Sequence, residues 1–284
     1  MTELGIAAID HLMTFVPSLD VAADTFERMG FRLSPVSRID AMGISNRMIL
    51  MRPGGLGRAN FIELMSSHDP DRLPGIMRTM LSGESGARSI VLAAGNINTV
   101  FDKISENGFS PSAPVHVTRE WQIDGEPSVF PEFDVILPIQ SPLIFNACQY
   151  HNAELYTRPD WLDHPNTAIC IKTIFAVSDD LEKTSFFENL LGYKRQHLAQ
   201  HEIRYPSSEI NLVVMSRDAA AHKFTMPANT ISPGFIGYEV TVASLKNLAN
   251  SLLVGQVPWS EIDGAIKIAP ADGLGNIILF REQS

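Results

Sequence analysis

Residues 9–31 run IDHLMTFVPSLDVAADTFERMGF, which is an apolar strand, a short polar turn, an amphipathic helix, and then a glycine followed by an aromatic. Three further segments repeat this order, at residues 88–109, 169–193 and 234–257. The first three copies share the spacing seen between Leu19 and Gly30, whereas the fourth is one residue shorter and lacks the aromatic. A glycine after the last helical turn is the expected left-handed stop, so each copy predicts a strand followed by a helix.

The sequence after each predicted helix leaves room for about three more strands. In the first copy we expect them around Arg32–Ile39, Ser45–Arg52 and Ala59–Met65, followed by a short helix near Leu73–Leu81. The unit is therefore βαβββ, repeated four times. A single unit leaves one face of a curved sheet uncovered, and pairing two units closes that face around a cavity. We expect an α+β fold in which four βαβββ modules pair into two half-barrel domains.

The polar, proline-containing stretch 152–166 separates the second copy from the third. We therefore predict an N-terminal domain over residues 1–151, a linker over 152–166, and a C-terminal domain over 167–284.

Two of the predicted strands each carry one ionisable residue where apolar residues are expected. Strand alternation puts His11 on a face with Ile9 and Met13, and Glu63 on a face with Met65. Burying an imidazole and a carboxylate costs several kcal/mol unless each group finds a partner. His11 and Glu63 are therefore expected to meet, either as a hydrogen-bonded pair or on a shared metal ion.

Composition limits the classes of partner. The chain has 284 residues, of which 45% are hydrophobic and 19% charged, as is usual for a globular protein with a real core. A net charge of -10 without a clustered basic surface argues against nucleic acid. We expect no signal peptide and no membrane span, and hence a cytoplasmic location. Cys148 and Cys170 lie in apolar runs, which favours buried free thiols over a disulfide.

Four stretches resemble the vicinal oxygen chelate superfamily, which includes glyoxalase I, bleomycin-resistance proteins and extradiol ring-cleaving dioxygenases. They are residues 9–12 with 19–20, residues 29–31, residues 61–64, and residues 273–280. Residues 43–47 and 148–166 resemble a four-module glyoxalase-like branch of that superfamily, most of whose members have no assigned reaction. The resemblance agrees with the fold expected from the repeats, and one such fold carries many functions.

The resemblance implies a divalent metal held inside the cup by the first and last strands of two paired modules. His11 matches the first-strand ligand and Glu63 the last-strand ligand. In the second module Ser89 stands in the position of His11, and Gln149 is the candidate for the last strand, with Asn146 as the alternative if a bulge shifts that strand. A Zn, Ni, Mn or Fe ion on His11, Glu63 and Gln149 and a metal-free His11–Glu63 pair both remain open.

Two more residues are candidates for binding substrate. Asn46 lies on a predicted strand that should line the same cavity, and we expect its side chain to face inward. His151 precedes the linker, where a polar group can close one end of the cavity. In the C-terminal pair Lys172, Gly237 and Leu279 occupy the matching positions, so we expect a degenerate site there.

Three functions follow as hypotheses. The first is a metal-assisted lyase or isomerase that acts on a small oxygenated metabolite, with Glu63 and His11 as catalytic residues. The second is a non-catalytic small-molecule binding protein of the bleomycin-resistance type. The third is a ring-cleaving dioxygenase-like enzyme, although four-module dioxygenases normally hold iron in the C-terminal pair. A small molecule is the expected partner in each case, and a homodimer is a further expectation.

Overall fold

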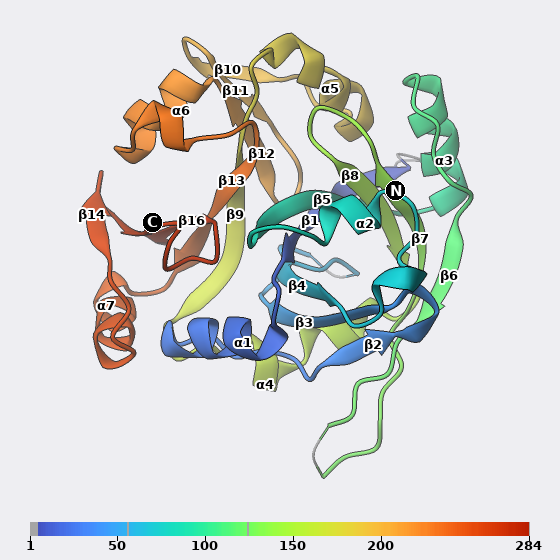
Figure 1. Cartoon of the computed structure of the whole chain (residues 1–284), viewed down its shortest axis with the longest axis horizontal. Coiled ribbons are helices and arrows are strands. Elements are labelled where there is room, and N and C mark those ends of the chain that lie inside the picture. Colours follow the sequence, from blue (N-terminus) through green and yellow to red (C-terminus); the bar gives the residue numbers. More distant parts are fainter. Residues whose placement is uncertain (1–4, 56, 124, 284) are drawn as a thin grey trace.

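The computed structural model describes residues 5–55, 57–123 and 125–283, and its strands form two eight-stranded sheets (Figure 1). The strand order is β2-β3-β4-β1-β5-β8-β7-β6 in the first sheet and β10-β11-β12-β9-β13-β16-β15-β14 in the second. Each sheet joins two modules through an antiparallel pair of first strands, and each first strand runs parallel to the last strand of its own module. The expected α+β fold of four βαβββ modules in two half-barrels is confirmed.

The strands of the first sheet lie between Ile6 and Tyr150. They are β1 (Ile6–Phe15), β2 (Ser37–Ile39), β3 (Ile44–Leu50), β4 (Phe61–Ser67), β5 (Gly86–Ala94), β6 (Val115–Thr118), β7 (Glu132–Ile139) and β8 (Phe145–Tyr150). The strands of the second sheet lie between Ala168 and Glu282. They are β9 (Ala168–Val177), β10 (Gln196–Ala199), β11 (Glu202–Tyr205), β12 (Asn211–Met215), β13 (Gly234–Val242), β14 (Ser260–Ile262), β15 (Ala265–Ile268) and β16 (Ile277–Glu282). The domain boundary at 152–166 stays a prediction.

One helix follows the first strand of each module, as the repeat predicts. These helices are α1 (Leu19–Arg28), α3 (Ile97–Glu106), α5 (Phe186–Leu191) and α7 (Leu245–Val254). Shorter α-helices are α2 (Met77–Met80), α4 (Pro159–Leu162) and α6 (Arg217–Phe224). Short 3-10 helices are η1 (Asp40–Met42), η2 (Pro70–Arg72), η3 (Ala153–Thr157), η4 (Leu181–Thr184) and η5 (Ala228–Thr230). Within the described ranges, no helix has the length and apolar character needed to cross a bilayer.

Glycines end the repeated helices in two ways. Gly30, Gly108 and Gly192 have φ of 83°, 84° and 73°, which is the left-handed stop expected from the sequence. In the fourth copy Gly255 keeps a right-handed conformation. A Cβ on Gly255 would lie 1.9 Å from the carbonyl oxygen of Arg28, so this glycine is needed because the end of α7 approaches α1 closely.

The sheets have different surroundings on their two faces. One face of both sheets packs with the helices in a large shared core, which includes Leu12, Phe26, Phe145 and Phe280. The opposite face of the first sheet curves around a cavity, which we call the N-terminal cup. The opposite face of the second sheet, the C-terminal cup, holds a separate apolar cluster around Phe175. The two cups are therefore the places where the modules can differ in function.

A β-bulge shifts the alternation of side chains in β1. Ile9 pairs with Leu92 and His11 pairs with Val91, so the register shifts between these two positions. Ile9 consequently joins the shared core, while His11 lines the cup. The prediction that Ile9 and His11 share a face is therefore wrong.

Candidate functional site in the N-terminal cup

The N-terminal cup is a mostly apolar cavity with a polar end. The volume open to the centre of a water-sized sphere is about 60 Å³, and the whole space not filled by protein atoms, including the open mouth, is about 560 Å³. Its apolar wall includes side chains from several strands, namely Met13, Ile44, Phe61, Met65, Val91, Val117, Phe133 and Val135. Its polar groups come from His11, Glu63, Arg119, Asn146, Tyr150 and Tyr156. A cavity of this kind suits a small molecule that is largely apolar and carries few polar atoms.

His11 is held by a carboxylate behind it and an aromatic ring beside it. Its Nδ1 lies 2.6 Å from Oδ1 of Asp10, and its ring stacks on Phe61 with centroids 4.0 Å apart. Tyr150 places its hydroxyl 3.3 Å from the same nitrogen. Burial would lower the pKa of His11, but the charges and hydrogen bonds of Asp10 and Glu63 outweigh burial and raise it. Nε2 of His11 is left to face Glu63.

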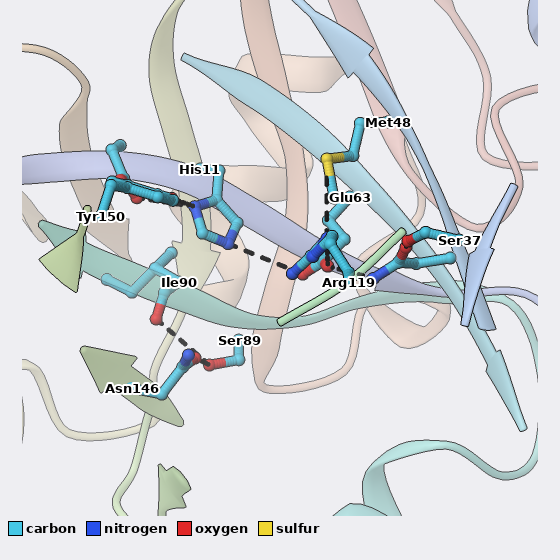
Figure 2. A network of polar contacts seen from close by, with 11 residues as sticks. His11, Ser37, Met48, Glu63, Ser89, Ile90, Arg119, Asn146 and Tyr150 are labelled. Atoms are coloured by element: carbon cyan, nitrogen blue, oxygen red, sulfur yellow. Dashed lines mark hydrogen bonds and ion pairs between the residues drawn. The ribbon is translucent and has the colours of Figure 1, made fainter. Parts of the chain in front are cut away.

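Glu63 receives three partners (Figure 2). Its Oε2 lies 3.6 Å from Nε2 of His11, and its Oε1 accepts a hydrogen bond of 2.8 Å from Nδ2 of Asn46. Nη1 of Arg119 lies 3.4 Å from the same Oε1. Burial would raise the pKa of Glu63, but the contact with His11 and the charge of Arg119 lower it below its ordinary value. The predicted meeting of His11 and Glu63 is therefore found, as an ion pair.

Arg119 is a buried residue that the sequence analysis missed. It follows β6, is 6% exposed, and lies over the ring of Phe133 at 4.5 Å from the centroid. The sequence carried a weak signal, because Arg119 is two positions after Val117 and so shares its cup-facing side. Asp10 was missed because neighbouring strand residues normally face opposite ways, and the bulge in β1 changes this.

Asn146, the alternative considered for the second module, occupies the position of Glu63. Glu63 pairs with Met13, two residues after His11, and Asn146 pairs with Val91, two residues after Ser89. Ser89 and Asn146 therefore hold in the second module the positions that His11 and Glu63 hold in the first. The hydroxyl of Ser89 donates a hydrogen bond of 2.8 Å to Oδ1 of Asn146.

The structure contradicts the expected placement of Gln149. Its Oε1 accepts a hydrogen bond of 2.8 Å from the backbone of Ile97 at the start of α3, on the opposite side of the sheet. The strand is therefore offset from the alignment that favoured Gln149.

One predicted substrate-binding residue faces the cup as expected, and the other does not. Asn46 lies on the cup face, because its cross-strand partner Met65 lines the cavity. Its side chain bonds Ser37 and Glu63, so it positions Glu63 and does not itself line the cavity. His151 is half-exposed on the outer face of the sheet, where its Nε2 lies 3.0 Å from Asp134. The prediction that His151 closes the cavity is wrong, because the alternation after Tyr150 turns it away from the cup.

The residues in the cup do not fit the divalent ion that the resemblance implies. Two ligand atoms 3.6 Å apart could share an ion, and the carboxylate behind His11 is typical of metal-bound histidine. However, Ser89 and Asn146 replace the other two ligands and bond each other, and the cationic Arg119 already contacts Glu63. A second cation there would meet both a poor ligand set and charge repulsion.

Comparisons with known proteins agree with this architecture. A family model described as a glyoxalase-like domain matches residues 9–190. No curated protein sequence matches the chain. A hypothetical protein from Staphylococcus aureus has a similar structure, with 14% identity, 97% of this chain and 99% of that chain covered, and a TM-score of 0.66.

Two solved enzymes show the same fold. The Mn(II)-bound glyoxalase from Novosphingobium aromaticivorans has 12% identity and a TM-score of 0.51, with 98% of this chain and 82% of that chain covered. A halotolerant catechol dioxygenase has 11% identity and a TM-score of 0.55, with 98% and 87% covered. At these identities the likeness concerns the fold.

Proposed function

The chain belongs to the glyoxalase-like domain family, and from the charged cluster in its N-terminal cup we propose that it binds a small, neutral, oxygenated molecule and moves a proton on the carbon beside a carbonyl group. The observation that carries this proposal is the buried ion pair of His11 and Glu63 at the polar end of an apolar cavity.

The balance of charge favours a neutral ligand. The cluster contains two acidic groups, Asp10 and Glu63, and two basic groups, His11 and Arg119, all of them buried. The raised pKa of His11 and the lowered pKa of Glu63 both favour the charged forms of the pair. An anionic or cationic ligand would leave an uncompensated charge in this site, which is costly.

Unused donors favour a ligand that carries an oxygen. Nε of Arg119 and the hydroxyl of Tyr156 are buried and lack a hydrogen-bond partner among the described residues, and both side chains line the cavity. A buried donor without a partner costs about 1–3 kcal/mol, which a ligand oxygen can recover. Burial also raises the pKa of Tyr156, so its hydroxyl stays protonated and able to donate. A ketone or hydroxyketone with an apolar body matches this arrangement.

The ion pair supplies one acid and one base. The carboxylate of Glu63 takes the proton from the carbon next to the carbonyl, and the bonding electrons form a carbon–carbon double bond. The carbonyl oxygen then takes the proton from Nε2 of His11, which yields an enol. Asp10 stabilises the charged ring of His11 before that transfer. Return of both protons, with the carbon protonated on either face, gives exchange or isomerisation.

Hydrogen–deuterium exchange tests the proposal. Small neutral ketones and hydroxyketones are incubated in D₂O with the protein, and loss of the proton beside the carbonyl is followed by ¹H NMR. Glu63→Gln should slow the enzyme-dependent exchange by about 100-fold or more. The matched control is Glu202→Gln, a buried carboxylate of the C-terminal half that pairs with Lys223 at 2.9 Å. Equal rates in wild type and Glu63→Gln would refute the catalytic assignment.

A second candidate is a sequestering protein of the bleomycin-resistance type. The lowered pKa of Glu63 favours it, because a carboxylate stabilised by His11 and Arg119 is a weaker base. In this case the same compounds bind in the cup, their protons do not exchange, and chelators leave the affinity unchanged.

A further inference from the structure

A second polar group lies on the first sheet, away from the cup. We propose that His116, Asp134 and His151 form a binding site for a divalent transition-metal ion such as Zn²⁺ or Ni²⁺. The sheet places these residues outside the cup, so the site is independent of the proposed function of the cup.

Three adjacent backbone segments hold the site. His116 on β6 and Asp134 on β7 are direct cross-strand partners. His151 follows β8 directly, and its backbone amide donates a hydrogen bond of 2.9 Å to the carbonyl oxygen of Glu132. Because the sheet fixes these backbones, few rotatable bonds have to be ordered when an ion binds.

Alternation separates this site from the cup. Val117, Phe133, Val135 and Tyr150 line the cavity, and each is a neighbour in sequence of one of the three residues. His116, Asp134 and His151 therefore project from the opposite face of the same strands. The site lies at the edge of the sheet, because β6 is its last strand and runs at the outer side of the molecule (Figure 1).

The side chains already converge. Nδ1 of His116 lies 2.9 Å from Oδ1 of Asp134, and Nε2 of His151 lies 3.0 Å from Oδ2. One ligand atom from each residue can be chosen so that all three lie within 4.8 Å of one another. Metal bonds of about 2.0–2.2 Å place ligand atoms roughly 3–3.6 Å apart, so small side-chain shifts admit an ion. The ion replaces the protons between the rings and the carboxylate.

The ligand chemistry favours transition metals. Two imidazole nitrogens and one carboxylate oxygen suit Zn²⁺, Ni²⁺ and related ions better than Mg²⁺ or Ca²⁺, which prefer oxygen ligands. The side chains of His116 and His151 are 56% and 36% exposed, so an ion can enter from solvent and keep bound water. In the described part of the chain, the hydrogen-bond partners of the Asp134 carboxylate are these two rings, in contrast to Glu63, which Arg119 also contacts.

Zinc titration of the full chain tests the site. Isothermal titration calorimetry with ZnCl₂ should show one equivalent bound by the wild type. His116→Ala, His151→Ala and Asp134→Asn should each weaken binding by at least about tenfold. His68→Ala is the matched control, because His68 faces a single carboxylate, Asp40, at 3.2 Å. Far-UV circular dichroism checks that each variant folds.

Cobalt provides a readout of the ligands themselves. Co²⁺ bound to the wild type should give visible d–d absorption bands, and His116→Ala and His151→Ala should lose them while His11→Gln and His68→Ala keep them. Absence of zinc binding to the folded wild type would overturn the proposal. Zinc retained undiminished by a folded His116→Ala/His151→Ala double variant, or lost in His11→Gln, would overturn it as well.

Discussion

The N-terminal and C-terminal cups share one topology and differ in what fills them. In the first sheet the register relates four positions on the first and last strands of the two modules, which hold His11, Glu63, Ser89 and Asn146. The strand register assigns Thr173, Val213, Gly237 and Leu279 to the matching positions in the second sheet. One cup therefore has polar groups around a cavity, and the other has small or apolar groups beside packed side chains such as Phe175 and Phe224.

This difference shows that the fold does not need the charged residues. The second sheet forms with an apolar centre, so the cost of burying the ionisable groups of the first sheet is not a cost of the architecture. The presence of these groups therefore supports the proposed function of the N-terminal cup. Substitutions that change one cup toward the other, or that break contacts of the N-terminal half, therefore test this comparison.

The largest effect is expected when Glu63 is replaced by an apolar residue, because the matching position of the other cup holds the apolar Val213. Glu63→Leu leaves the buried cations of His11 and Arg119 without their carboxylate and should lower the free energy of unfolding by about 3–5 kcal/mol. Urea denaturation measures the loss. Glu202→Leu is the control, because its partner Lys223 is 36% exposed and can be solvated. An equal loss of unfolding free energy in both variants would show that Glu63 contributes no more to stability than the half-exposed pair of Glu202 and Lys223.

In the C-terminal cup, loss of packing should dominate instead. Leu279→Ala removes a buried side chain from the cluster around Phe175 and should cost about 3 kcal/mol of unfolding free energy. Ligand binding in the other cup should not change. Thermal unfolding and the exchange assay on the same variant measure the two properties, and loss of exchange in a folded Leu279→Ala protein would break the proposed division of roles.

Acid should destabilise the contact that His164 makes with the first module. Nδ1 of His164 accepts a hydrogen bond of 3.0 Å from the backbone of Arg32, and Nε2 donates to the carbonyl oxygen of Leu50 at 2.8 Å. Burial lowers the pKa of His164 from 6.5 to about 4. The unfolded chain therefore binds a proton before the folded protein does, and stability falls as pH drops from 6.5 toward 4.

Between pH 7 and pH 5 this histidine should remove about 2 kcal/mol of stability. Urea denaturation at the two pH values measures the difference. His164→Asn keeps one donor and one acceptor without the titration, so its pH dependence should be smaller by that amount. The same slope in both proteins would assign the acid sensitivity to other groups.

The smallest effect is expected at Asp10, which acts through His11. Asp10→Asn removes the charge that raises the pKa of His11 and should lower that pKa, as NMR titration of the ring would report. We expect a stability loss of about 1 kcal/mol, since an amide oxygen can still accept from Nδ1. An unchanged pKa of His11 would show that the charge of Asp10 does not affect the acidity of the His11 ring.

The fold was more predictable than the site. Repeated glycine stops such as Gly30 and Gly108 and the apolar strands before them were sufficient for the modules and their pairing. His11 and Glu63 could be paired because each broke an apolar pattern. The contact of Asp10 with His11 could not be predicted, because it depends on the bulge in β1. Gln149 was favoured over Asn146 by a sequence alignment, but the strand register gives the position to Asn146.

The C-terminal half shows the same limit of alignment. Lys172 was assigned to the position of the third module that matches His11, whereas the register gives that position to Thr173. Local pattern predicts which segments are strands, but a shift of one residue reverses the face of every side chain that follows. The expected homodimer and cytoplasmic location stay predictions.

Methionine methyl groups allow the most direct test, because both cups contain them. Met13, Met65 and Met77 line the N-terminal cup, and Met215 and Met226 belong to the C-terminal cluster. With ¹³C-methyl-methionine protein, small neutral ketones that bind should shift the first group of signals, leave the second in place, and lose this effect in Glu63→Leu. Shifts confined to Met215 and Met226, or shifts that persist unchanged in Glu63→Leu, would contradict the assignment of function to the N-terminal cup.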